Sequence, residues 1–246
     1  YQNNFIIRIL FSFYVLKKIN KNSLIISRSL ISSLVLSIFG VKNILELHHP
    51  PKGLSSLIFY FYRLLKLDKN LGYIFLHKNI QKNLKIEKGI VLDDACDLRD
   101  FKLRKMKIKY EYCYVGSLFK GKGLEKIIGL ANYFPQKKFH VFGNIKTIES
   151  NLNNIKIEKI KNLYLHNFKS YKYIPKILMS SKFLLLPYSN KVLVNSKNLE
   201  VSNFMSPLKM FDYLASGKII IASDLKVYSH ILKKNINCLM PKKNNL

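Results

Sequence analysis

The chain has 246 residues and 48% hydrophobic content, which is enough for one large domain or two ordinary ones and excludes global disorder. Its net charge is +28, with the lysines spread along the chain rather than gathered in a basic block. This charge suits a nucleic acid or an anionic membrane as partner. Because Lys, Asn and Ile are all abundant, we attribute most of the excess to AT-rich codons.

Three cysteines, Cys96, Cys113 and Cys238, lie far apart without metal-ligand spacing, so we expect a cytoplasmic protein with no zinc site. The most apolar early stretch, 24–39, contains Arg28 and is shorter than the roughly 20 residues that a membrane span needs. The first residue is Tyr1 rather than Met, so we expect the chain to be a fragment.

The first half alternates short apolar strands, expected at 23–27, 43–48, 72–76 and 89–92, with helices expected at 29–40 and 54–66. Such alternation predicts right-handed βαβ units and a parallel sheet. A charged stretch, 93–109, has no clear strand and is typical of a linker. We therefore place a domain boundary near Asp100, giving domains 1–100 and 101–246.

The second half repeats this pattern, with strands expected at 112–116, 139–143, 163–165, 183–187 and 219–222. Leu124, Ile127, Ile128 and Ala131 have the spacing of one helix face. The fold class predicted is α/β, with two doubly wound, Rossmann-like parallel-sheet domains in tandem and the first apparently truncated.

A glycine-rich loop, "GSLFKGKG" at 116–123, joins a predicted strand to a predicted helix. Helix N-termini attract phosphates, and glycines let the backbone approach them closely. The spacing nearly matches a Walker A loop, but Gly123 stands where that loop has a hydroxyl residue for magnesium. No strand end supplies a convincing Walker B acid. A purely structural turn is the alternative interpretation.

A second segment, "SPLKMFDYLASGKIIIAS" at 206–223, predicts a helix that leads directly into a buried strand. Ser206 is placed to cap the helix, Pro207 suits its first position, and Gly217 suits the left-handed residue beyond its end. Asp212 lies at the border of the apolar face. The alternative role for this acid is a surface pair with Lys209, worth only about 0.2–0.5 kcal/mol.

Taken in order, five motifs resemble group 1 glycosyltransferases, the GT4-type retaining enzymes of GT-B fold. They are "NILELHHPP", "VLDDACDLRDF", "YVGSLFKGKGLEKIIGLA", "LYLHNF…YIPKILMSSKFLLLPYS" and "SPLKMFDYLASGKIIIASDL". The resemblance covers nearly the whole chain from about Ser23. It implies a donor-binding C-terminal domain and an acceptor-side N-terminal domain.

The resemblance assigns roles residue by residue. It makes Asp212 the ribose-binding acid, and it makes His48 the cleft histidine, our candidate catalytic residue that positions the sugar. The donor diphosphate would be bound by Gly116, Ser117, Lys120, Lys122, Ser206, Pro207 and Leu208. Lys122 and a helix N-terminus can stabilise a leaving diphosphate without metal, so we expect neither a metal nor a cofactor.

Three positions depart from the family pattern. Phe204 stands where the first acid of the E-x7-E motif is expected, and Glu200 is nearby but out of register. Ser117 stands where the family often has Arg after the first glycine of the loop. Asp212 is one methylene shorter than the usual Glu. These departures bear on sugar recognition more than on the phosphate site.

The function predicted is therefore transfer of a sugar from a nucleotide-sugar donor to a cell-envelope glycan or lipid-linked acceptor, with retention. We expect it in the cytoplasm at the inner face of the membrane, in polysaccharide biosynthesis, as a peripheral protein on an anionic surface and with no specific nucleic-acid partner. The alternatives are a basic nucleic-acid-binding α/β protein, and a GT-B relative that epimerises or phosphorolyses sugars.

Overall fold

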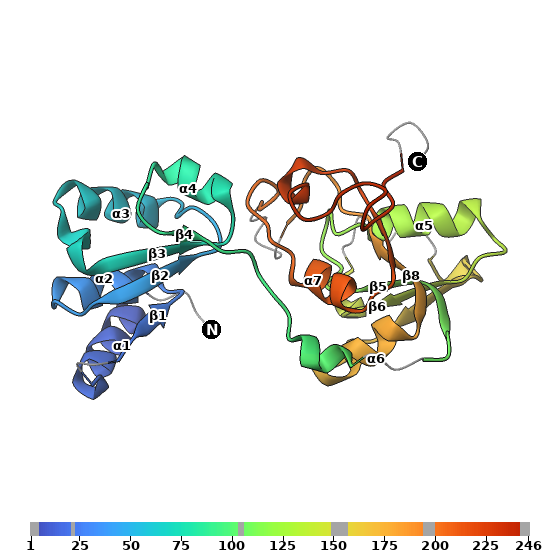
Figure 1. The fold of residues 1–246 in the computed structure, drawn as a ribbon, viewed down its shortest axis with the longest axis horizontal. Helices are drawn as coiled ribbons and strands as arrows, with labels where there is room; N and C mark the ends of the chain where they lie inside the picture. The colour runs from blue at the N-terminus through green and yellow to red at the C-terminus, as the bar shows by residue number, and fades with distance from the viewer. Residues whose placement is uncertain (1–4, 21–22, 103–105, 149–156, 194–199, 242–246) are drawn as a thin grey trace. The chain divides into compact units, whose positions relative to one another are not determined.

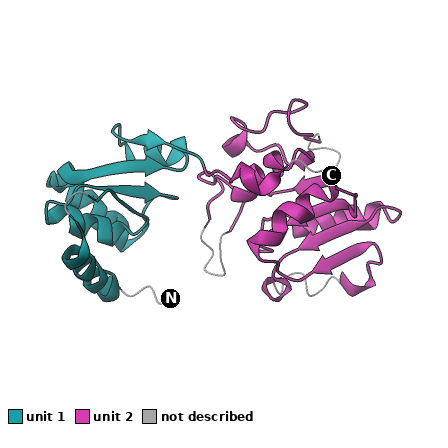
Figure 2. Cartoon of the chain, turned by 60° about the horizontal axis from the view of Figure 1, so that its bottom comes forward, with its two compact units in different colours: residues 1–93 teal, residues 94–246 magenta. Residues whose placement is uncertain are grey.

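The computed structural model describes residues 5–20, 23–102, 106–148, 157–193 and 200–241. The chain divides into two compact units, residues 1–93 and 94–246, each with its own sheet (Figure 2). This division falls before the boundary expected near Asp100, because Cys96 and Phe101 pack on the core of the second unit. Of the charged stretch 93–109, residues 103–105 lie outside the described residues.

The first unit is a four-stranded parallel sheet in the order β1-β2-β3-β4 (Figure 1). All four strands were predicted, whereas the sequence reasoning missed helices α1 and α4. In chain order its elements are α1 Phe5–Lys18, β1 Ile25–Ser27, α2 Leu30–Ile38, β2 Asn43–Leu47, α3 Leu54–Leu64, η1 Leu67–Asn70, β3 Leu71–Phe75, α4 Lys78–Leu84 and β4 Ile90–Val91.

Burial in the first unit follows the strand alternation. Leu45 of β2 and Tyr73 and Phe75 of β3 are buried, while the residues between them are less so. The Tyr62 hydroxyl of α3 donates to the Leu34 carbonyl of α2 at 3.4 Å, which joins these two helices. No helix in the described part of the chain is long and apolar enough to cross a membrane.

The second unit is a five-stranded parallel sheet in the order β7-β6-β5-β8-β9. The predicted strands are all present, and β9 has the predicted bounds. Its elements are η2 Leu98–Phe101, β5 Tyr110–Val115, α5 Leu124–Tyr133, β6 Phe139–Phe142, η3 Ile145–Thr147, η5 Ile157–Lys159, β7 Leu163–His166, η6 Tyr171–Tyr173, α6 Ile174–Met179, β8 Ser181–Leu186, α7 Leu208–Ala215, β9 Ile219–Ala222 and η7 Lys226–Tyr228.

Helices cover both faces of this second sheet. On one face Tyr114 and Leu185 pack with Ile127 of α5. On the other face Cys113 packs in a cluster that includes Met210 of α7. The strand order reverses at β5, since the chain builds outward through β6 and β7 and then returns to β8 and β9 on the other side. The fold is therefore a doubly wound α/β arrangement with a switch point between β5 and β8.

Candidate functional site

The carboxyl ends of β5 and β8 mark the place where doubly wound sheets bind ligands. The predicted glycine loop follows β5 and begins at Gly116, whose amide donates to the Phe142 carbonyl at 2.9 Å. Pro187 and Tyr188 follow β8. Helix α7 is held against the same place, because the buried Tyr213 hydroxyl accepts the Val115 amide at 2.9 Å.

Two glycines of the loop are required by backbone packing. Gly121 and Gly123 have φ of 79° and 100°, which a side chain rarely adopts. A Cβ at Gly121 would lie 1.9 Å from the Lys191 carbonyl oxygen, and one at Gly123 would lie 2.5 Å from that of Pro187. The structural interpretation of the loop therefore holds for these two glycines, which let it pack on the segment after β8.

Gly116 has a different neighbour. A Cβ at this position would lie 2.1 Å from the side-chain nitrogen of Lys209, so the missing side chain makes room for that lysine. The Lys209 Nζ donates to the Tyr114 hydroxyl at 2.7 Å. That hydroxyl in turn donates to the Ser117 carbonyl at 2.7 Å. Lys209, which the sequence reasoning did not assign to the site, is thus connected through Tyr114 to the glycine loop.

Lys122 and Lys209 converge on one aromatic ring. Their Nζ atoms lie 5.0 Å and 5.3 Å from the ring centroid of the buried Tyr188. The Lys209 Nζ also lies 3.9 Å from the Tyr114 ring centroid. These are distances at which a cation is attracted to an aromatic face.

Burial lowers the pKa of Lys122 to about 8. Burial, and then repulsion from Lys122, lower the pKa of Lys209 well below its ordinary value. Among the described residues no carboxylate forms an ion pair with either lysine. The two lysines together form a desolvated cationic site to which an anion is the complementary ligand.

The start of α7 differs by one residue from the prediction. Pro207 is the N-cap rather than the first helical residue, and the side chain of Ser206 does not cap the helix. Instead the Ser206 hydroxyl accepts the Asp94 amide at 3.0 Å. Gly217 does adopt the expected left-handed conformation, with φ of 66°. Leu208 is exposed at the first turn.

Asp212 is a buried carboxylate on the same helix. Its Oδ1 accepts a hydrogen bond from the Tyr171 hydroxyl at 3.0 Å. Burial raises the pKa of Asp212, and the Tyr171 hydrogen bond opposes that rise. The surface pair with Lys209 is absent, since each side chain of that suggested pair engages a tyrosine from another element. Asp212 therefore presents a partly engaged acceptor one helical turn from Lys209.

Three other positions named in the sequence analysis, Lys120, Phe204 and Glu200, belong to the second unit. Lys120 is exposed, and its carbonyl accepts the Leu193 amide at 3.2 Å. Phe204 donates its amide to the Val201 carbonyl at 2.9 Å. Glu200 accepts from the Ser202 hydroxyl at 3.1 Å. The site therefore has no carboxylate at position 204, where the E-x7-E motif of the family has its first acid.

His48 belongs to the first unit and directly follows β2. Its Nδ1 is 2.9 Å from an Arg28 guanidinium nitrogen, and its Nε2 contacts the Glu46 carboxylate. Because Arg28 can only donate, the His48 Nδ1 accepts that hydrogen bond. The Nε2 atom therefore carries the ring proton and donates a hydrogen bond to the Glu46 carboxylate. The sequence reasoning did not foresee this cluster, which fixes both ring nitrogens of His48.

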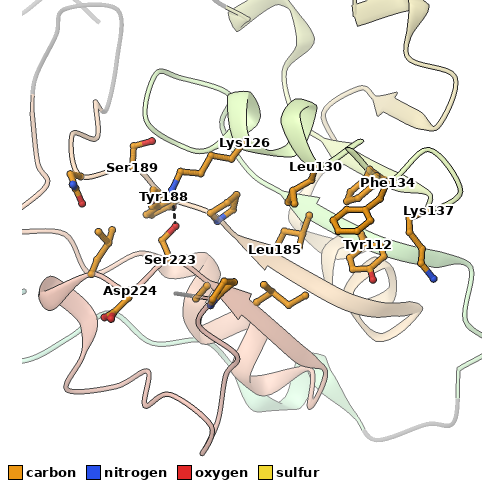
Figure 3. A pocket seen from close by; sticks show the side chains of 17 residues that line it. Tyr112, Lys126, Leu130, Phe134, Lys137, Leu185, Tyr188, Ser189, Ser223 and Asp224 are labelled. Atoms are coloured by element: carbon orange, nitrogen blue, oxygen red, sulfur yellow. Dashed lines mark hydrogen bonds between the residues drawn. The ribbon is translucent and has the colours of Figure 1, made fainter. Parts of the chain in front are cut away.

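A cavity of about 680 Å³ opens on the α5 face of the second unit (Figure 3). Its walls are mostly apolar, and the Lys126 Nζ at one end donates to the Ser223 hydroxyl at 3.2 Å. Tyr188 lines the cavity as well as lying under the lysine pair. Within the described ranges no group of three or more His, Cys, Asp or Glu residues is placed to hold a metal ion.

Comparison with known proteins places the fold. No protein-family model and no curated protein sequence matches the chain. The structure is similar to that of HepE of Anabaena, solved with UDP-glucose, with a TM-score of 0.66 and 12% sequence identity. The match covers 94% of this chain and 68% of HepE. It is also similar to a glycosyltransferase from Rickettsia africae, with a TM-score of 0.68 and 13% sequence identity. That match covers 100% of this chain and 69% of the Rickettsia protein.

A third similar structure is the catalytic domain of starch synthase IV of Arabidopsis thaliana, bound to ADP and acarbose. The TM-score is 0.60 at 10% identity, with 95% of this chain and 63% of that one covered. The chain thus spans about two thirds of the length of these proteins. At such low identity the likeness establishes the fold, and it confirms the predicted GT-B class.

Proposed function

We propose that this chain is part of a glycosyltransferase that moves a sugar from a nucleotide-sugar donor. The observation that carries the proposal is the pair of lysines, Lys122 and Lys209, held together on Tyr188 at the switch point of the second sheet. Two desolvated cations without a carboxylate partner among the described residues are complementary to a diphosphate. The GT-B fold and the nucleotide ligands of the similar structures support this choice.

The chemistry follows from where charge develops. When the glycosidic bond to the donor breaks, negative charge grows on the leaving nucleoside diphosphate. Lys122 and Lys209 would stabilise that charge, with help from the N-terminus of α7. Asp212 would accept hydrogen bonds from the ribose hydroxyls, using the oxygen that Tyr171 leaves available. No metal is needed for this stabilisation, and we propose none.

The finer assignment rests on the motif resemblance. We propose a GT4-type enzyme that retains configuration and acts on a cell-envelope glycan or a lipid-linked acceptor in polysaccharide biosynthesis. We place it at the inner face of the cell membrane as a peripheral protein. His48 remains the predicted sugar-positioning residue. Its test is His48→Asn, which should slow sugar transfer while leaving donor affinity within about twofold.

A panel of ligands tests the proposed function. We expect UDP-glucose, ADP-glucose or GDP-mannose to raise the melting temperature of the chain more than glucose, UMP or AMP does. Stabilisation by none of the diphosphate compounds would refute the proposal. With a radiolabelled donor, a labelled acceptor product supports transfer. An epimerised donor or a sugar phosphate as product would instead favour the epimerase or phosphorylase alternative.

A further inference from the structure

Helix α3 of the first unit carries an apolar stripe that points into solvent. Leu54, Leu57, Phe61 and Leu64 follow the spacing of one helix face. Tyr60 and Leu65 flank the stripe, and all six side chains are between 50% and 70% exposed. Single exposed leucines are ordinary on proteins, but a contiguous row of large apolar side chains marks an interaction surface.

The rotation of this helix is fixed by its other side. Phe59 is buried and makes an edge contact with the Tyr73 ring, with centroids 6.1 Å apart. Tyr62 is buried and bonds to α2 through the Leu34 carbonyl. Turning the stripe inward would therefore expose two aromatic side chains. The packing of Phe59 and Tyr62 therefore holds the stripe on the exposed side of the helix, where a partner outside the unit can reach it.

The charge around the stripe is positive. Helix α3 contains no acid, and Lys66 and Lys69 follow it as exposed residues. Arg63 lies on the helix and donates to the Leu84 carbonyl at 2.9 Å. The nearest acid along the chain, Asp68, pairs with Lys88 at 3.0 Å. An apolar row bordered by lysines is complementary to a layer of anionic headgroups over acyl chains.

We infer that α3 docks this protein on an anionic lipid bilayer, lying in the plane of the surface with Leu57, Phe61 and Leu64 among the headgroups and upper acyl chains. At 11 residues the helix is far shorter than the roughly 20 needed to span a bilayer. Lys66 and Lys69 would meet the headgroup phosphates. The inference deepens the membrane location in the proposed function and does not depend on donor binding, so the two can fail separately.

The absence of tryptophan from the sequence allows a direct test. Leu57→Trp puts a single fluorophore on the stripe of the full chain, where Leu57 is 52% exposed. Tyr133→Trp puts one at a still more exposed site at the end of α5, where Tyr133 is 78% exposed. With vesicles of phosphatidylglycerol and phosphatidylcholine, we expect a blue shift for the α3 reporter and none for the α5 reporter. Equal shifts for both, or none for α3, would overturn the inference.

A second experiment measures the loss of vesicle binding when the stripe is made polar. The variant Leu57→Ser/Phe61→Ser should reduce co-sedimentation with anionic vesicles by at least about tenfold. The control Tyr133→Ser/Ile236→Ser removes two apolar side chains elsewhere that are more exposed than Leu57 and Phe61, and this variant should bind like the unaltered chain. Circular dichroism checks that each variant is folded. Equal binding to pure phosphatidylcholine vesicles would contradict the role of charge and overturn the inference.

Two further outcomes decide between partners. If light scattering finds a dimer that Leu57→Ser/Phe61→Ser dissociates, and vesicles do not bind, the stripe is an interface between two copies and the inference is wrong. If Leu10→Trp on α1 shifts with vesicles while Leu57→Trp does not, α1 is the docking element and the inference is again wrong. Donor binding without vesicle binding would overturn it while leaving the proposed transfer intact.

Discussion

Lys122 and Lys209 are the residues on which the proposed function depends most. Two partly buried ammonium groups near one ring repel each other, and that repulsion is relieved when an anion binds between them. Lys209→Met should weaken binding of UDP by at least about tenfold, or roughly 1.4 kcal/mol. Titration calorimetry measures this loss. Lys226→Met, at an exposed lysine of the same unit, is the matched control and should bind normally.

Proton uptake should accompany anion binding at this site. In the free protein Lys122 has a pKa of about 8, so it loses its proton as the pH rises through that value, and a bound diphosphate raises its pKa again. Binding is therefore strongest below pH 8 and weakens above it, with protons taken up near that pH. Calorimetry in buffers of different ionisation enthalpy counts these protons. Proton uptake that stays unchanged in Lys122→Met would contradict the assignment.

Part of this site could be predicted from the residues and part could not. Lys122 and Asp212 lie in segments with recognisable local patterns, a glycine loop and a capped helix. Lys209 entered the sequence analysis only in the alternative interpretation, as a surface partner of Asp212. Helical spacing alone cannot show that a lysine side chain reaches a glycine on another element. Tyr114 and Tyr171 were not assigned a role from the sequence, since the partners of their hydroxyl groups depend on tertiary packing.

Gly116 links two elements of the site. Its φ of 151° and the closeness of Lys209 both disfavour a side chain. Gly116→Ala should displace the Lys209 side chain and weaken binding of UDP, with a smaller effect on overall stability. Calorimetry and thermal unfolding of the same variant separate these two effects. A loss of stability with donor affinity unchanged would mean that the glycine serves the turn alone.

Strands β6 and β7 carry a pair of neighbouring histidines that should make the stability of the fold depend on pH. His140 Nδ1 is 3.1 Å from His166 Nε2, and the His140 ring stacks on Tyr164. Burial, with repulsion from His166 and Lys138, lowers the pKa of His140 to about 4. In the unfolded chain this histidine has its ordinary pKa of about 6.5 and is protonated below that pH. In the folded chain it stays neutral until the pH falls to about 4.

Stability should therefore fall as the pH drops from about 6.5 to 4. His140→Phe keeps the stacking with Tyr164 and removes the titrating ring, so it should flatten that part of the profile. Denaturant unfolding at several pH values measures the effect. The same slope in the variant and the unaltered chain would rule out His140 as its source.

At the scale of the whole molecule, the strand–helix alternation was enough to predict two α/β units and each strand, β1 to β9, that the described residues form. The boundary between the units was predicted less accurately. Phe101, the last residue of η2 in the charged stretch, joins the core of the second unit through contacts that no local pattern reveals. Helix α1 was missed because its apolar residues run all around it, with no single face to identify. The GT-B class came from the order of motifs, and the structure confirms it.

The net charge of +28 makes a prediction of its own. Exposed lysines should bind oligonucleotides without sequence preference, and this binding should fall steeply as salt rises from about 50 to 200 mM. Binding of UDP at the partly buried lysine pair should fall much less, since such groups are screened less. Filter binding and calorimetry over one salt series compare the two. Sequence-selective oligonucleotide binding that persists at high salt would favour the nucleic-acid alternative.

The central claim is that the second unit binds a nucleotide sugar through Lys122 and Asp212. Titration calorimetry of the full chain, Lys122→Ala and Asp212→Asn with the best donor of the panel tests it most directly. We predict that each substitution weakens donor binding at least about tenfold, or roughly 1.4 kcal/mol, while Lys226→Ala does not. Unchanged donor affinity in both site variants would contradict the assignment of the site.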